Sequence, residues 1–160
     1  MDDITLDAVD AATLREAVNY IAIRRLQQAY ADTVTRRAWP ELRELFRSDA
    51  EVVIDKRDGS PIVLVGPDAV GEFIGAAIAQ FEFFEFVILN TRIDIDGDRA
   101  SARLWMQELR QDHSGRWTNA YGLYVDQHER VDGRWWFAGR HYRSLARTAR
   151  DNDVFGIPEL

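Results

Sequence analysis

The side chains best suited to acid–base chemistry lie at two places in the chain. Tyr30 and Asp32 follow a long apolar stripe, and His141 lies in an aromatic-rich segment near the end. A carboxylate or an imidazole can remove a proton next to a carbonyl, and a phenol can hold the enolate oxygen that results. Asp32 would need apolar surroundings that raise its pKa. The structural alternatives are a core position for Tyr30, an ion pair with Arg36 one turn later for Asp32, and a satisfied or solvent-facing sheet position for His141.

Four further polar side chains could bind a substrate. Asn90 follows an apolar run, so its amide needs partners, which a ligand carbonyl or the sheet backbone could supply. Tyr124 and Asp126 share one face of an expected strand. Arg140 could hold an anionic or carbonyl group. Asp126 could instead pair with Arg140 on the next strand, and such a pair would lower the carboxyl pKa and make it a poor base.

The composition excludes several classes of site. The chain has 160 residues, 46% of them hydrophobic and 29% charged, which suits one globular domain. Its net charge of −7 argues against a nucleic-acid partner. The chain has no cysteine, and it shows neither a metal-binding histidine spacing nor a phosphate-binding glycine loop, so we expect no metal and no cofactor. No apolar run approaches the roughly 18 residues that cross a bilayer. The acidic start is unlike a signal peptide, and we expect a cytoplasmic protein with no membrane partner.

Spacings of three and four residues predict helices in the first half of the chain. We expect a flexible arm over residues 1–12. Thr13 and Glu16 fit a capping box, which would start a long helix there. A short helix is expected near Trp39 and a third helix near Gly66, each beside a proline that suits a first turn. The apolar stripe of the long helix comprises Leu14, Val18, Ile21, Ala22, Leu26, Ala29, Tyr30 and Val34.

Alternating patterns predict a sheet in the second half. Asp132-Gly133 lies between two aromatic-rich runs, and this dipeptide is a strong signal for a tight hairpin turn. Short turns favour antiparallel pairing of consecutive strands. The predicted fold is therefore α+β, with one domain over residues 13–147 and a tail over 148–160. The expected strands occupy residues 50–55, 61–65, 84–94, 99–111, 116–130 and 134–145.

Several phrases of this sequence are similar to the SnoaL-like branch of the nuclear-transport-factor-two-like superfamily. The resemblance covers roughly residues 13–147 and implies N-terminal helices packed on a strongly curved antiparallel sheet, which together form a cone around a small ligand. Known members include isomerases, dehydratases, dehydrochlorinases, polyketide cyclases and non-enzymatic proteins. The phrases are RRLQQAYADTVTRRAWPELRELF (24–46), VGPDAVGEFI (65–74), ILNTRIDIDGDRASARL (88–104) and YGLYVDQHERVDGRWWFAGRHYRSL (121–145).

The resemblance also implies which residues would face the ligand. The dehydratase-like members use a His–Asp dyad, and their Asp and His positions fall on Thr35 and about Phe86 here, so both members of the dyad are missing. Tyr124 and His141 could replace the dyad from another direction. Gly122 beside Tyr124 would leave room for a ligand. The substrate-binding set implied in this way is Asn90, Tyr124, Asp126, Arg140, Phe86 and Trp39, and Trp39 has the alternative of a core or interface position.

The resulting expectation is a pocket protein for a hydrophobic or aromatic, oxygenated small molecule. As an enzyme it would be a cofactor-free lyase or isomerase of the dehydratase or cyclase type, with Tyr30, Asp32 and His141 as catalytic residues. The alternative is a non-catalytic ligand-binding protein, or a structural small subunit similar to the β subunit of aromatic-ring dioxygenases. We also expect a homo-oligomer, a dimer or trimer, formed through the convex face of the sheet, where Trp105 stands outward between polar neighbours.

Overall fold

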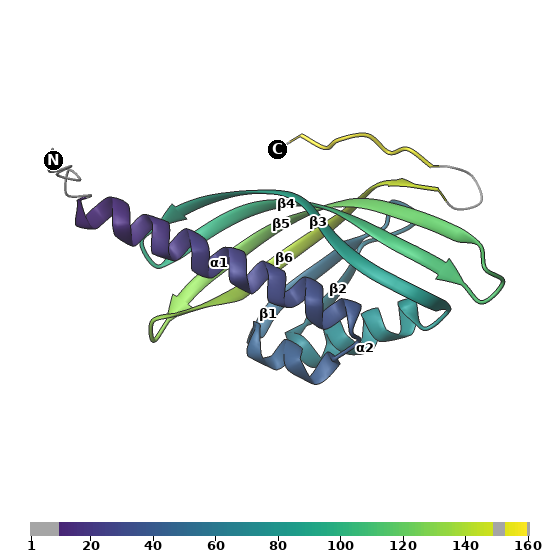
Figure 1. Ribbon diagram of the computed structural model, residues 1–160, viewed down its shortest axis with the longest axis horizontal. Coiled ribbons are helices and arrows are strands. Elements are labelled where there is room, and N and C mark those ends of the chain that lie inside the picture. The colour runs from purple at the N-terminus through teal and green to yellow at the C-terminus, as the bar shows by residue number, and fades with distance from the viewer. Residues whose placement is uncertain (1–9, 149–152, 160) are drawn as a thin grey trace, which may run out of the picture.

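The computed structural model describes residues 10–148 and 153–159, and helices and strands follow one another in the predicted order (Figure 1). Two strands begin earlier than predicted, the first at residue 46 rather than 50 and the third at residue 81 rather than 84. The predicted arm lies mostly outside the described residues, and residues 11–12 already belong to the first helix. The elements are α1 (Ala11–Thr35), a 3-10 helix η1 (Trp39–Glu44), β1 (Phe46–Asp55), β2 (Ile62–Val65), α2 (Gly66–Ile78), β3 (Phe81–Asp96), β4 (Arg99–Asp112), β5 (Trp117–Val131) and β6 (Arg134–Arg147).

Helix α1 begins one turn before the predicted capping box. The carboxylate of Asp10 accepts hydrogen bonds from the backbone N–H groups of Ala12 and Thr13, at 2.8 and 2.9 Å. The Thr13 hydroxyl donates to the same carboxylate at 2.9 Å, so it is a partner of the cap and not the cap itself. The prediction that Thr13 caps the helix is therefore wrong. A charged acceptor complements the positive end of the helix dipole better than a hydroxyl does.

The sheet has six strands in the order β2-β1-β6-β5-β4-β3. All neighbours pair antiparallel except β1 and β6, which run parallel. The tight turn between β5 and β6 is confirmed, because Asp132 and Gly133 have φ of 52° and 78°, as a type I′ turn requires. The α+β fold is thus confirmed, with α1 packed on a mostly antiparallel sheet. The strong curvature stays a prediction.

The core lies between α1 and one face of the sheet, which we call the inner face. This face carries the alternating buried side chains of the strands, such as Leu104, Tyr124 and Phe137. Helix α1 lies along the sheet, while α2 and η1 gather at one end of it, beside β1 and β2 (Figure 1). The buried residues of α1 are Asn19, Ile23, Leu26, Gln27, Tyr30, Thr33 and Val34. Two helical layers therefore cover different parts of the inner face.

The described part of the C-terminal tail lies against the end of β6. The backbone N–H of Phe155 donates to the carbonyl of Leu145 at 2.8 Å, and Val154 forms a bridge with Ala146. The guanidinium of Arg147 lies 5.0 Å from the centre of the Phe155 ring. Residues 149–152 and 160 of the predicted tail lie outside the described residues. None of the helices in the described ranges is long and apolar enough to cross a membrane.

Candidate active site

A buried ion pair surrounded by aromatic rings forms the centre of the inner face. The Arg140 guanidinium donates two hydrogen bonds to the carboxylate of Asp126, at 2.6 and 2.8 Å, and the two side chains are 1% and 0% exposed. The same guanidinium carbon lies 4.1 Å from the ring centres of Tyr30 and Tyr124 and 4.4 Å from that of Phe137. The predicted Asp126–Arg140 pair is therefore confirmed, and it is fully enclosed.

The charges of this pair stabilise each other. Burial lowers the pKa of Arg140, but the neighbouring Asp126 carboxylate outweighs burial and holds that pKa above its usual range. Burial also raises the pKa of both Tyr30 and Tyr124, so the two phenols stay protonated at neutral pH. The centre of the inner face thus contains a hydrogen-bonded ion pair and two neutral hydroxyls.

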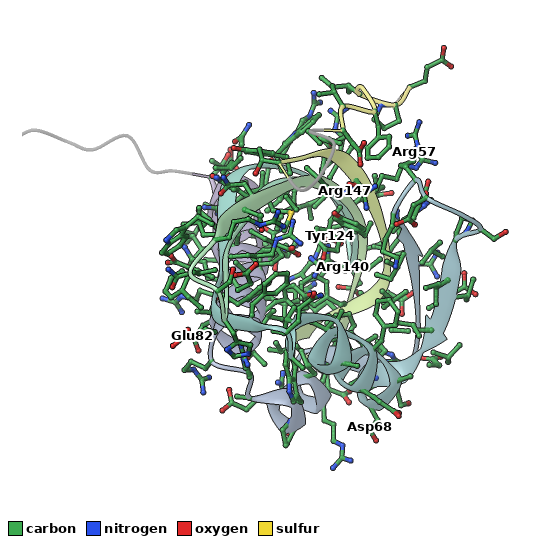
Figure 2. The ribbon with its side chains drawn as sticks, turned by 90° about the vertical axis from the view of Figure 1, so that its right-hand side faces the viewer. Arg57, Asp68, Glu82, Tyr124, Arg140 and Arg147 are labelled. Atoms are coloured by element: carbon green, nitrogen blue, oxygen red, sulfur yellow. The ribbon has the colours of Figure 1, made fainter. Side chains whose placement is uncertain are left out.

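A cavity of about 300 Å³ lies beside this centre, between α2 and the inner face of the sheet. Figure 2 shows Tyr124, one of its lining residues, next to Arg140 in the interior of the molecule, while Asp68 and Glu82 lie at the periphery. Helix α2 contributes apolar side chains, and the strands contribute both polar and apolar ones. The lining residues are Ile54, Lys56, Phe73, Ile74, Ala77, Ile78, Gln80, Phe81, Glu108, Arg110, Ala120, Tyr124, Tyr142, Ser144 and Arg147. A cavity with an apolar body and a few polar groups suits a small organic ligand.

Glu108 on β4 is the carboxyl group of this cavity. Its side chain is 21% exposed, and burial raises its pKa, which the charge of Arg110 partly opposes. The Arg110 Nε atom lies 3.7 Å from a Glu108 oxygen, too far for a hydrogen bond. Burial, helped by the charge of Glu108, raises the pKa of Tyr142 to about 12. The cavity therefore brings together a carboxyl group whose raised pKa suits proton transfer and the hydroxyl of Tyr142, which stays protonated.

Our sequence reasoning missed Glu108 and Arg110, although a signal for them was present. Leu104 and Met106 point to the inner face and alternate with outward residues on β4. The same alternation places Glu108 and Arg110 on the inner face. Both residues follow an apolar stretch, so in the sequence they resemble the solvent-exposed end of a strand. They are enclosed because α2 covers this end of the sheet.

Of the three predicted catalytic residues, only Tyr30 lies in the interior. Asp32 is 61% exposed and pairs with Arg36 at 2.7 Å, and the hydrogen bond from Arg36 lowers its pKa. The premise that apolar surroundings raise this pKa is wrong. His141 lies on the outer face, since its strand neighbours Arg140 and Tyr142 point inward. Tyr124 and His141 are thus on opposite faces and cannot act as a pair.

The predicted binding residues divide in a similar way. Phe86 and Tyr124 face the interior, and their rings lie 5.4 and 6.3 Å from that of Tyr30. Asn90 is exposed and stands opposite Trp105, because the strand register shifts just before it. It does not line the cavity.

The remaining two predictions, on Trp39 and Gly122, are also corrected. Trp39 packs on α2, where a methyl group added to Gly71 or Gly75 would lie 3.2 Å from it. It lies outside the cavity. The space beside Gly122 is filled by the Tyr142 ring, which a methyl group there would meet at 2.3 Å, so the glycine accommodates a side chain and not a ligand.

The two positions of the missing dyad contact each other. The Thr35 hydroxyl oxygen accepts a hydrogen bond from the backbone N–H of Phe86 at 3.0 Å. This contact joins the end of α1 to β3, where an Asp and a His would meet in the dehydratase-like proteins. Glu108 is the direct partner of Phe86 across the β3–β4 pair. The carboxyl group of the cavity is therefore one strand away from the position of the absent imidazole.

Comparison with known proteins decides the family. The model of the SnoaL-like domain matches residues 15–141. The chain belongs to the SnoaL-like family. This confirms the resemblance seen in the sequence. No curated protein gives a significant match.

Solved structures with this SnoaL-like fold include three with informative names. A provisionally assigned scytalone dehydratase from Novosphingobium aromaticivorans is 25% identical, with a TM-score of 0.74 over 90% of this chain and 97% of that one. The hexachlorocyclohexane dehydrochlorinase LinA-type3 from Novosphingobium barchaimii is 19% identical, with a TM-score of 0.74 over 91% and 99%. The β subunit of a provisionally assigned aromatic-ring-hydroxylating dioxygenase from Novosphingobium aromaticivorans is 19% identical, with a TM-score of 0.67 over 81% and 90%.

Proposed function

We propose that this SnoaL-like protein is a cofactor-free lyase of the dehydratase type, or an isomerase, and that Glu108 is its general base. The substrate is a hydrophobic or aromatic, oxygenated small molecule held between α2 and the sheet. The observation that carries the proposal is the placement of Glu108, a mostly buried carboxyl group in a cavity of about 300 Å³ beside Tyr124 and Tyr142. Burial raises the pKa of this carboxyl above its ordinary value, which makes its carboxylate a stronger base.

The reaction follows from the groups present. The Glu108 carboxylate takes a proton from the carbon next to a substrate carbonyl, and the electron pair of the C–H bond moves to the carbonyl oxygen. The hydroxyl of Tyr142 or Tyr124 donates a hydrogen bond to the enolate that forms. When the enolate collapses, the β-hydroxyl leaves with the proton from Glu108, which gives an unsaturated ketone and water. An isomerase would return the proton to another carbon instead.

The relatives support an elimination. Two of the similar structures are named for the loss of water and of hydrogen chloride, and both reactions remove a proton from carbon and expel a neighbouring group. In this chain the positions of the usual dyad hold Thr35 and Phe86, so a base is needed from elsewhere. Glu108 supplies it from the strand position directly opposite Phe86.

The test is proton exchange at carbon. A panel of aryl β-hydroxyketones, neutral and ring-carboxylated, is incubated with the protein in D₂O, and deuterium at the α-carbon and dehydration are followed by NMR. We expect Glu108→Gln to lower both rates by about 100-fold or more, because the amide cannot accept the proton. Asp32→Asn, which changes an exposed carboxylate, is the matched control and keeps the wild-type rate. Wild-type exchange in Glu108→Gln would exclude Glu108 as the base.

The second candidate is a structural small subunit, which the likeness to a dioxygenase β subunit favours. The choice between the two functions also concerns the proposed homo-oligomer. Its interface would be the outer face of the sheet, where Trp105 is half-buried. Light scattering on the purified chain distinguishes the two. A self-contained dimer or trimer with exchange activity supports the enzyme, and an inactive chain that assembles only with a large subunit supports the structural role.

A further inference from the structure

Arg110 lines the α2 cavity, and two nitrogen atoms of its guanidinium are buried without a hydrogen-bond partner. Its Nε and Nη2 atoms are fully buried, and no described residue accepts a hydrogen bond from either. The nearest carboxylate oxygen, on Glu108, is 3.7 Å from Nε. Buried donors of a charged group are costly to leave unpaired, so this pair of N–H groups is a place where a ligand acceptor would be strongly favoured.

We infer that the ligand of this cavity carries a carboxylate, which binds side-on to the Nε and Nη2 atoms of Arg110. This inference names the substrate class of the proposed function and rests on the same cavity. Nε and Nη2 form the edge of the planar guanidinium that matches the two oxygens of a carboxylate. The Phe81 ring, 5.2 Å from the guanidinium carbon, supports the group from one side.

The charges around the cavity favour an anion. Lys56, Arg110 and Arg147 line it, against the single carboxyl of Glu108. Arg147 already pairs with Asp58 and Asp153, at 3.2 and 3.3 Å. Lys56 and Arg110 therefore stand against the single carboxyl of Glu108, which is a local excess of positive charge in a chain of net charge −7.

The rest of the ligand is apolar and small. Phe73, Ile74, Ala77 and Ile78 of α2 face the polar strand residues across the cavity. The volume of about 300 Å³ lies at the lower end of the roughly 300–1,000 Å³ usual for ligand sites. These features together describe an aromatic or alicyclic carboxylate of one or two rings.

Arg110 also places the acid relative to the base. A carboxylate bound to Arg110 lies near Glu108, because the two residues are separated by Leu109 alone and so point to the same face of β4. The acidic carbon of the substrate would then be held beside the Glu108 oxygens while its ring contacts α2. Replacing Glu108 by a neutral amide removes a negative charge beside the bound carboxylate, so this change should not weaken carboxylate binding.

The test compares two probes of the same shape, naphthoate and the neutral naphthamide, by isothermal titration calorimetry. We expect naphthoate to bind the wild type about tenfold or more tightly than naphthamide. Arg110→Met should remove this preference while leaving naphthamide binding within about twofold. Arg103→Met, on the same strand but on its outer face, is the matched control and keeps the preference. Arg110→Lys keeps the charge without the fork, and should bind naphthoate less tightly than the wild type; it is used if Arg110→Met does not fold.

Equal affinity for the two probes, or an unchanged preference in Arg110→Met, would overturn the inference. No binding of either probe would overturn both the inference and the cavity on which the proposed function depends. The two proposals separate in Glu108→Gln. If this variant retains both naphthoate binding and exchange activity, the role of Glu108 fails while the carboxylate site stands. If it loses exchange and the probes bind equally, the base stands and the carboxylate site fails.

Discussion

The enclosed pair of Asp126 and Arg140 allows a sharp prediction about stability. Each residue is replaced by an apolar one of similar length, Asp126→Leu and Arg140→Met, singly and together. In either single variant one charge stays behind in a site that is at most 1% exposed, surrounded by the rings of Tyr30, Tyr124 and Phe137. The double variant leaves no charge there, and Met retains contact with the rings.

The magnitudes follow from the burial. Removing one partner of a buried, hydrogen-bonded pair costs about 3–5 kcal/mol, because the other charge keeps its desolvation penalty without compensation. Replacing both partners by apolar groups is often close to neutral, so we expect the double variant to lose less than about 2 kcal/mol. The coupling between the two sites should therefore be large.

The assay is urea unfolding at pH 7, followed by fluorescence and circular dichroism for all four proteins. Arg43→Met is the matched control, because Arg43 pairs with Asp68 at a similar distance of 2.7 Å but with 64% and 70% exposed side chains. We expect Arg43→Met to unfold at nearly the same urea concentration as the wild type, because solvent screens this exposed pair. Single-variant losses below about 1 kcal/mol, or a double-variant loss equal to their sum, would refute the view that the charges stabilise each other in an apolar core.

Three further predictions concern the inner face. Burial lowers the pKa of His128 from 6.5 to about 4. About 3 kcal/mol of folding stability, fully present above pH 6.5, should therefore be lost as the pH falls through 4. In unfolding titrations His128→Leu should not show this loss of stability in acid. Burial raises the pKa of Glu108, so the stability that its protonated form contributes is complete below the ordinary pKa of 4.5 and is lost as the pH rises through the pKa of the folded state. Glu108→Gln should therefore be more stable, relative to wild type, at pH 8 than at pH 4. An equal difference in stability at both pH values would contradict this. Gly122→Ala should cost about 1–3 kcal/mol in thermal unfolding, because its methyl group would overlap the Tyr142 ring; a wild-type melting temperature would show that the ring moves freely.

Much of the fold could be predicted because local signals and tertiary packing agree. The alternation along residues 84–145 and the Asp132-Gly133 turn identified four strands and the position of the last hairpin turn. The start of α1 was missed because two nearby acceptors, Asp10 and Thr13, both fit a cap, and only the geometry of the first turn distinguishes them. The parallel pairing of β1 with β6 joins residues about 90 positions apart, and no local pattern reveals it.

The site could be predicted only in part, and the reason is strand parity. Adjacent residues of a strand point to opposite faces, so Arg140 and His141 cannot both face one cavity, and this alone argues against one of them. Asn90 is a different case. The register shifts between Ile88 and Asn90, which turns the side chain outward, and a one-residue shift of this kind leaves no trace in composition.

The absence of the dyad acquires a physical explanation from the contact between its two positions. In this chain the Thr35 hydroxyl satisfies the backbone N–H of Phe86, and the Phe86 ring packs on Tyr30 at 5.4 Å, so the end of α1 is closed by an apolar contact. One strand further, at Glu108, the inner face is covered by α2 and borders a cavity, where a carboxyl group can reach a ligand. The chemistry that the family usually places on β3 can therefore persist on β4, at the same level of the sheet, with Arg110 two residues further on to hold an anionic substrate beside it.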